Sequence, residues 1–149
     1  MINEQRVRAI KMNPDQIKLV QESFKKVVPI ASEAAELFYG RLFTISPDLK
    51  PLFTGDIKVQ GTKLMKMLSV VVSGLSNLDT LLPTVKALGK RHVDYGVTAD
   101  MYGAVGESLL WTLEQGLSEA FTPDVKEAWT AAYLTLQTVM CDAAYSESI

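Results

Sequence analysis

Apolar residues recur three and four positions apart along most of this 149-residue chain, and sustained alternation of apolar and polar residues is absent. The first spacing places side chains on one face of a helix, whereas alternation would indicate a strand. The two-residue turns typical of a β-hairpin are also missing from the sequence. We therefore predict an all-α domain of about seven helices, too many and too unequal in length for a simple four-helix bundle.

Proline and the residue before it mark the predicted helix boundaries. Asn13 followed by Pro14 supplies a side-chain cap and a residue suited to the first helical turn, and Thr122 is followed by proline in the same way. Pro29 predicts the end of the first helix, and we expect a break near Pro83. The predicted helices cover about residues 13–28, 32–46, 58–73, 81–95, 98–117 and 122–140, with a short helical turn over 47–53. Residues 1–12 would then be an N-terminal extension, and 13–149 the domain.

The composition excludes several classes of protein. Apolar residues make up 48% of the chain, which suffices for a substantial core, and the net charge is −2 without a block of like charges. A nucleic acid or an anionic membrane is therefore not expected as a partner. No uninterrupted apolar run approaches the roughly 18 residues of a spanning helix, and the first residues do not resemble a secretory signal. The single cysteine, Cys141, excludes an internal disulfide and is compatible with the reducing cytoplasm, where we expect the protein.

His92 is the only histidine of the chain. One imidazole is too few for a zinc site, but it can hold a haem because the porphyrin already supplies four nitrogens. Leu88 and His92 are four residues apart and share one helix face, as do Gln60 and Leu64 on another helix. Each pair combines a polar and an apolar side chain, which is the combination that a haem pocket requires. Taken alone, such a histidine is more often structural or exposed.

A series of motifs follows in order along the chain: Phe38-Tyr39-Gly-Arg-Leu-Phe43, Pro47, Leu52-Phe53, Gln60-x-x-x-Leu64, His92, Tyr95-Gly96-Val97, Tyr102, Val105-Gly106 and Ala128-Trp129. In this order and spacing the motifs resemble the globin family. The greatest similarity is to bacterial single-domain haemoglobins, neuroglobin-like bacterial globins and the haem domain of flavohaemoglobins. The resemblance covers the chain from Asn13 to about Tyr145. It implies a globin fold, in which a three-on-three helical sandwich encloses haem b.

The resemblance also implies roles on both sides of the haem. His92 would be the proximal iron ligand, while Tyr39 and Gln60 would donate hydrogen bonds to a gas on the distal side. Leu64 would lie over the iron, and Phe53 would stack on the porphyrin. The other residues expected to contact the cofactor are Phe38, Leu88, Val97, Tyr102 and Val105, with Lys63 and Arg91 as candidates to meet the two propionates.

The chain departs from the flavohaemoglobin pattern in two respects. Those proteins place a glutamate of the last helix against the proximal histidine, whereas an ungapped match puts Ala144 there and Asp142 two residues away. A strongly hydrogen-bonded proximal histidine is therefore not expected. The match also extends almost to the last residue, so we expect any reductase to be a separate protein. The globin itself would be a monomer or a homodimer.

With one histidine, no second imidazole can close the sixth position of the iron. We expect a pentacoordinate ferrous haem that is open to oxygen, nitric oxide or carbon monoxide, unless Tyr39, Gln60 or Lys63 reaches the iron. Hydrogen bonds to a charged acceptor contribute roughly 1.5–3 kcal/mol each, which favours slow oxygen release. Reversible oxygen binding with nitric oxide dioxygenation is the leading interpretation. The alternatives are a gas sensor acting through a partner protein and a haemless globin-like scaffold used for interaction alone. At the level of single residues, Tyr39 could instead be ordinary core and Gln60 a solvated surface residue.

Overall fold

The structure, a computed structural model, describes residues 12–53, 55–94 and 101–141. Within these ranges all regular structure is helical, which confirms the predicted all-α class. The elements are α2 (Pro14–Val27), η1 (Val28–Ile30), α3 (Ala31–Ile45), η2 (Pro47–Leu52), α4 (Ile57–Gly74), η3 (Leu75–Asn77), α5 (Leu78–Asp94), α6 (Met101–Leu117), η4 (Ser118–Ala120) and α7 (Pro123–Cys141), where η denotes a 3₁₀ helix.

Local capping interactions begin two of these helices where the sequence predicts. The side chain of Asn13 accepts a hydrogen bond from the backbone N–H of Gln16 at 2.8 Å, and the Gln16 side chain accepts one from the backbone N–H of Asn13 at 3.3 Å. This reciprocal pair is a capping box. At the start of α7, Thr122 Oγ1 accepts from the backbone N–H of Val125 at 3.3 Å. Both predicted helix starts are confirmed.

The predicted break near Pro83 is wrong. Helix α5 runs without interruption from Leu78 to Asp94, with Pro83 inside it. Pro83 lies early in the helix, and its missing N–H removes a single intrahelical bond, the one that would reach the carbonyl of Asp79. Because α5 follows η3 directly, the helix also starts before Leu81, where the sequence pattern placed it.

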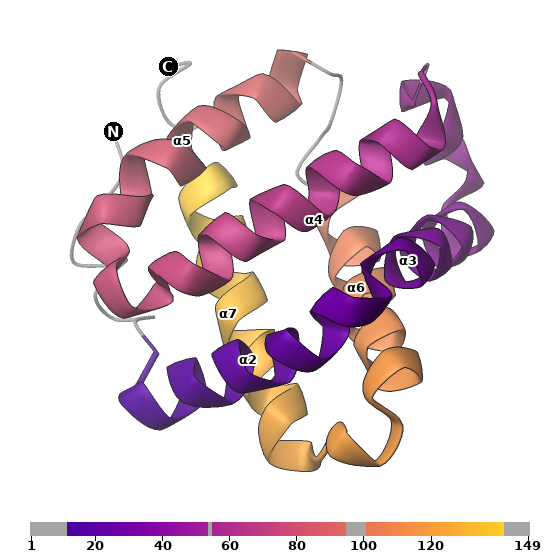
Figure 1. Ribbon diagram of the computed structural model, residues 1–149. Coiled ribbons are helices and arrows are strands. Elements are labelled where there is room, and N and C mark those ends of the chain that lie inside the picture. Colours follow the sequence, from indigo (N-terminus) through magenta and orange to yellow (C-terminus); the bar gives the residue numbers. More distant parts are fainter. Residues whose placement is uncertain (1–11, 54, 95–100, 142–149) are drawn as a thin grey trace.

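The helices pack in crossed pairs, as Figure 1 shows. Helix α2 lies across α7, α3 crosses α6, α4 packs on α3, and α5 packs on α7. From η3 the helices α4 and α5 diverge as the two arms of a V, in front of α6 and α7. This arrangement places the start of α4 and the end of α5 at the open side of the V.

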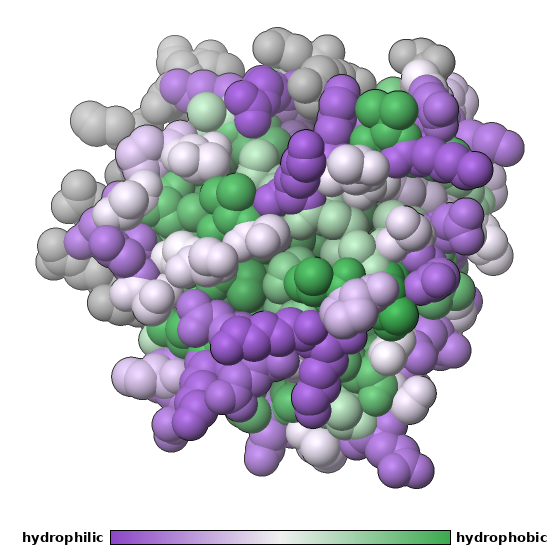
Figure 2. Space-filling view, in the orientation of Figure 1, coloured by the Kyte–Doolittle hydropathy of each residue, from purple (hydrophilic) through white to green (hydrophobic). Residues whose placement is uncertain are grey.

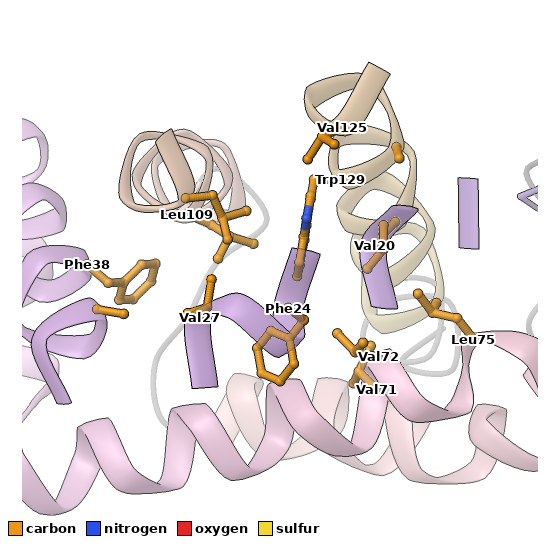
Figure 3. Close-up of a cluster of buried hydrophobic side chains, with 14 of the residues drawn as sticks. Val20, Phe24, Val27, Phe38, Val71, Val72, Leu75, Leu109, Val125 and Trp129 are labelled. Carbon is orange, nitrogen blue, oxygen red and sulfur yellow. The ribbon is translucent and has the colours of Figure 1, made fainter. Parts of the chain in front are cut away.

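A cluster of buried apolar side chains joins the crossed helices (Figure 3). Phe24 of α2 and Trp129 of α7 are 6% and 2% exposed, and their ring centroids are 6.2 Å apart. The indole Nε1–H of Trp129 donates to Ser23 Oγ at 2.8 Å, so its polar atom is satisfied inside the core. Val71 and Val72 add α4 to the same cluster. The core therefore fixes α4 against the α2–α7 pair.

Two glycines allow α4 and α5 to approach their neighbouring helices closely. A Cβ atom on Gly61 of α4 would lie 2.9 Å from Ala35 Cβ of α3. A Cβ atom on Gly89 of α5 would lie 2.5 Å from the Met140 carbonyl oxygen of α7. Helix α5 thus packs against α7 with backbone nearly touching backbone. Gly89 lies three residues before His92, so this contact sets where that histidine lies.

One stretch within the described residues, Ile57–Val93, is apolar and long enough to cross a membrane if length and composition alone are considered. It consists of α4 and α5, and the chain turns back on itself between them at η3 (Figure 1). Val71, Val72 and Val85 of this stretch are buried in the core. Core packing accounts for these residues, whereas Ile57, Val59, Val70 and Val93 of the same stretch are exposed.

Candidate functional site

Tyr39 of α3 lies inside a cluster of aromatic rings. It is 5% exposed, and its ring centroid lies 5.0 Å from that of Phe38, 5.9 Å from that of Phe43 and 5.3 Å from that of Phe53. The rings of Phe38 and Phe53 meet it edge to face, an arrangement that aromatic quadrupoles favour. The phenol is therefore held in place by α3 itself and by the residue that follows η2.

Gln60 of α4 meets the same phenol. Burial raises the pKa of Tyr39 above its ordinary value, and a side-chain hydrogen bond with Gln60 offsets part of that rise. A tyrosine whose pKa is raised keeps its proton at neutral pH, so its hydroxyl can donate a hydrogen bond. Gln60 is half-buried. The two residues predicted to serve the distal side are thus brought together from different helices.

Leu64 lies one turn beyond Gln60 and packs half-buried against the core. Together with Phe38 it lines a cavity of about 20 Å³, whose other walls include Leu68, Leu109 and Trp129. The lining is apolar, and the volume suffices for one molecule the size of water. Leu64 and Phe38 therefore border an apolar space inside the helices.

His92 lies half-buried near the end of α5. Its Nδ1 atom is 2.8 Å from the carbonyl oxygen of Leu88. Because a carbonyl only accepts, Nδ1 carries the hydrogen, and the lone pair of the neutral ring is at Nε2, which is the form that a metal needs. Burial lowers the pKa of His92, the bond to Leu88 raises it, and the positive charge of Arg91 lowers it further. The lowered pKa keeps the ring neutral at pH 7.

Tyr102 of α6 packs on this imidazole. It is 5% exposed, and its ring lies 6.4 Å from the His92 ring at an interplanar angle of 25°. Tyr133 of α7 donates a hydrogen bond from its hydroxyl to the backbone carbonyl of Tyr102 at 2.5 Å. A Cβ atom on Gly106 would come within 2.6 Å of the Tyr133 ring, so only a glycine leaves room for this contact. His92, the predicted proximal ligand, is therefore backed by residues from two further helices.

From the sequence alone Tyr133 is interpreted as an ordinary packing residue, so its contact with Tyr102 is not predicted. The available signal is Gly106, a glycine in the interior of a helix, where it lowers helix propensity. Such a residue indicates a close approach by a neighbouring side chain. Gly106 lies four residues after Tyr102 and therefore shares a face of α6 with that tyrosine.

For the other residues predicted to contact the haem, the structure gives their position on a helix and their burial. Val105 of α6 and Leu88 of α5 are half-buried and pack against the core. Lys63 and Arg91, the candidates for the propionates, are exposed on α4 and α5. Val97 lies outside the described residues. So do Asp142 and Ala144, so the predicted absence of a proximal glutamate stays a prediction.

The residues present suit a haem. They offer one neutral imidazole with its lone pair at Nε2, aromatic and aliphatic walls, and two hydrogen-bond donors on other helices. His92 and Gln60 belong to the two arms of the V, near its open side (Figure 1). Among the described residues, no group of three histidine, cysteine, aspartate or glutamate side chains could hold a bare metal ion. The donor set therefore fits an iron that brings its own equatorial nitrogens.

Comparison with known proteins agrees with this assignment. The family model described as "Globin" matches residues 36–140. The "Flavohemoprotein" of Bacillus subtilis (strain 168) is 31% identical over 119 residues, which are 75% of this chain and 30% of that protein. The "Flavohemoprotein" of Vibrio cholerae serotype O1 (strain ATCC 39315 / El Tor Inaba N16961) is 31% identical over 125 residues, 79% of this chain and 32% of that protein. The chain thus spans about a third of the length of these relatives. It belongs to the globin family, as a haem-binding globin related to the flavohemoproteins.

Proposed function

We propose that this globin binds oxygen tightly but reversibly at a haem ligated by His92, and that it turns over nitric oxide. The observation that carries the proposal is the placement of Tyr39, 5% exposed among the rings of Phe38 and Phe53, with the Gln60 side chain near enough to lower the pKa of its phenol. This placement brings two polar side chains together inside otherwise apolar walls. The haem, when bound, supplies the iron at which oxygen and nitric oxide react to give nitrate, and an external electron donor restores its ferrous state.

The distal pair would hold oxygen by hydrogen bonding. The Tyr39 hydroxyl stays protonated because burial raises its pKa, and the Gln60 amide adds a second donor. A hydrogen bond to a charged acceptor contributes about 1.5–3 kcal/mol. Neighbouring bonds are rarely additive, so a single bond of about 1.5 kcal/mol gives the lower bound. That bound is roughly a tenfold slower release of oxygen.

Slow release suits a reactive role better than a delivery role. A carrier must give up its oxygen, whereas a protein that reacts oxygen with nitric oxide has no such requirement. His92 is the only histidine in the sequence, which leaves no second imidazole to compete with the gas. The relatives named as flavohemoproteins support a haem that works together with a flavin. For this chain we propose that the flavin belongs to a separate reductase.

Oxygen dissociation tests the distal pair. We expect Tyr39→Phe and Gln60→Ala each to speed dissociation of oxygen about tenfold, because each removes one donor to the bound gas. Stopped-flow displacement of oxygen by carbon monoxide measures the rate. Gln115→Ala, on the exposed surface of α6, is the matched control and should leave it unchanged. Unchanged rates in the single variants and in the double variant would show that the pair does not contact the gas.

Nitrate formation tests the enzymatic part separately. Mixing the oxygenated protein with one equivalent of nitric oxide should produce one equivalent of nitrate and the ferric spectrum within milliseconds. If no nitrate forms while oxygen dissociation still depends on Tyr39, the protein is an oxygen binder without this activity.

A further inference from the structure

Two rows of exposed side chains border the V between α4 and α5. Both rows follow the three- and four-residue spacing that keeps side chains on one helix face. On α4 and the adjoining η3 the row is Val59, Lys63, Lys66, Val70, Ser73 and Asn77, and on α5 it is Thr80, Thr84, Ala87 and Arg91, all of them exposed.

The two rows meet at the closed end of the V. There Val70 and Ser73 of α4 lie opposite Thr80 and Thr84 of α5, and these four residues line one surface groove. Figure 2, drawn in the orientation of Figure 1, shows apolar residues reaching the surface between these two helices. The residues that line the groove thus present apolar groups, hydroxyls and the amide of Asn77, and none of them is charged.

At the open end, the rows run on to residues beside the haem site. Lys63 lies three residues from Gln60, and Arg91 is adjacent to His92. A molecule seated along the groove would therefore lie against the edge of the site, between the arms that carry the distal glutamine and the proximal histidine.

The charge of these rows differs from that of the rest of the chain. The rows hold three cations, Lys63, Lys66 and Arg91, and no carboxylate. Residues 57–93 as a whole contain six lysine and arginine residues and one acidic residue, Asp79. Residues 101–141 contain five acidic residues and one lysine. A chain whose net charge is −2 therefore concentrates positive charge on the face formed by α4 and α5.

We propose that the groove between α4 and α5 docks an acidic flavoprotein that delivers electrons to the haem. The proposal rests on the proposed function, which requires a donor that returns the ferric iron to the ferrous state. In each transfer the reduced flavin loses one electron and the iron gains it, and no covalent bond joins the two proteins. Opposite charges accelerate such encounters, and an uncharged floor lets the surfaces meet without burying unpaired charges.

The test uses a flavodoxin, a small acidic flavoprotein, as the probe. Lys66→Glu changes the row of side chains beside the groove but no residue assigned to the haem, and Lys25→Glu on the exposed face of α2 makes the same change in net charge elsewhere. We expect Lys66→Glu to weaken binding of oxidised flavodoxin about tenfold at low ionic strength, as measured by calorimetry. The second-order rate of reduction of the ferric protein by photoreduced flavodoxin should fall to the same extent, and its dependence on salt should become shallower. Lys25→Glu should change both quantities less than twofold.

A neutral reductant separates docking from the haem itself. The semiquinone of lumiflavin, which is neutral at pH 7, should reduce the wild type and both variants at equal rates. Equal loss of flavodoxin binding in Lys66→Glu and Lys25→Glu would overturn the proposal, because net charge alone would then account for it.

Two other occupants of the groove would also overturn the proposal. One is a second copy of the chain, detected as a dimer by analytical ultracentrifugation that Lys66→Glu dissociates. The other is an anionic membrane, detected as binding to phosphatidylglycerol vesicles by a protein that does not bind flavodoxin. A purified chain without a Soret band would instead contradict the proposed function. Flavodoxin binding measured by calorimetry would still test the groove in that case.

Discussion

The imidazole of His92 is oriented from one side by its own helix and from another by a neighbouring ring. The hydrogen bond from Nδ1 to the carbonyl of Leu88 fixes the tautomer, and the Tyr102 ring limits rotation of the imidazole. A ligand that is already oriented loses little entropy when it binds a metal. The local i, i+4 spacing of Leu88 and His92 is visible in the sequence, whereas the contact with Tyr102 depends on how α5 and α6 pack.

His92→Gly should therefore remove most of the haem from the purified protein. The substitution deletes the axial bond and leaves the apolar walls, so we expect the Soret absorbance per protein to fall at least fivefold. Free imidazole at millimolar concentration should restore it, because the small molecule fits the space of the deleted ring and offers the same nitrogen. A Gly103→Ala variant, altered on the exposed surface of α6, serves as the control and should keep its haem. A His92→Gly protein that retains the full Soret band would show that another residue ligates the iron.

Helix boundaries in this chain are largely local properties, and for that reason the sequence predicts most of them. Asn13 and Thr122 cap their helices through residues three positions away. The uninterrupted course of α5 through Pro83 was not predictable in this way, because it depends on η3 and on the packing of α5 against α7. The same holds for the site. His92, Tyr39 and Gln60 belong to recognisable motifs, but the link from Tyr133 to Tyr102 joins helices that only the fold brings together.

The close packing of α5 on α7 makes a prediction about stability. In Gly89→Ala the added methyl group would meet the backbone of Met140 at 2.5 Å, and α5 must move away to accommodate it. We expect the free energy of unfolding to fall by about 1–3 kcal/mol, as is usual for overpacking. In Gly103→Ala nothing lies within 4 Å of the new atom, so alanine should raise the stability by about 0.5–1 kcal/mol through its better helix propensity. Urea unfolding of both variants measures the difference, and equal effects of the two substitutions would contradict the close approach of α5 to α7.

The molecule as a whole divides into a core that is complete in itself and a site that is not. Phe24, Trp129 and the valines of α2 and α4 bury one another in the core. The arms of the V, α4 and α5, hold His92 and Gln60, and residues 57–93 contain six lysine and arginine residues against one acidic residue. A ligand that fills the V adds its binding free energy to the stability of the folded state. The stability that the ligand adds should be largest in α4 and α5 and not equal in all helices.

Amide hydrogen exchange can locate this gain. Removing the haem should speed exchange most in the second half of α5, around His92, and in the first half of α4, around Gln60, because these segments lose contacts that only the cofactor supplies. Amides of α2 and of α7 near Trp129 should change little, since the indole keeps its bond to Ser23 and its packing against Phe24. Mass spectrometry of peptides from the holo and apo forms makes the comparison, and the Trp129 peptide serves as the internal control. Uniform acceleration along the chain would mean that the haem completes one cooperative core, and the division between core and site would then be wrong.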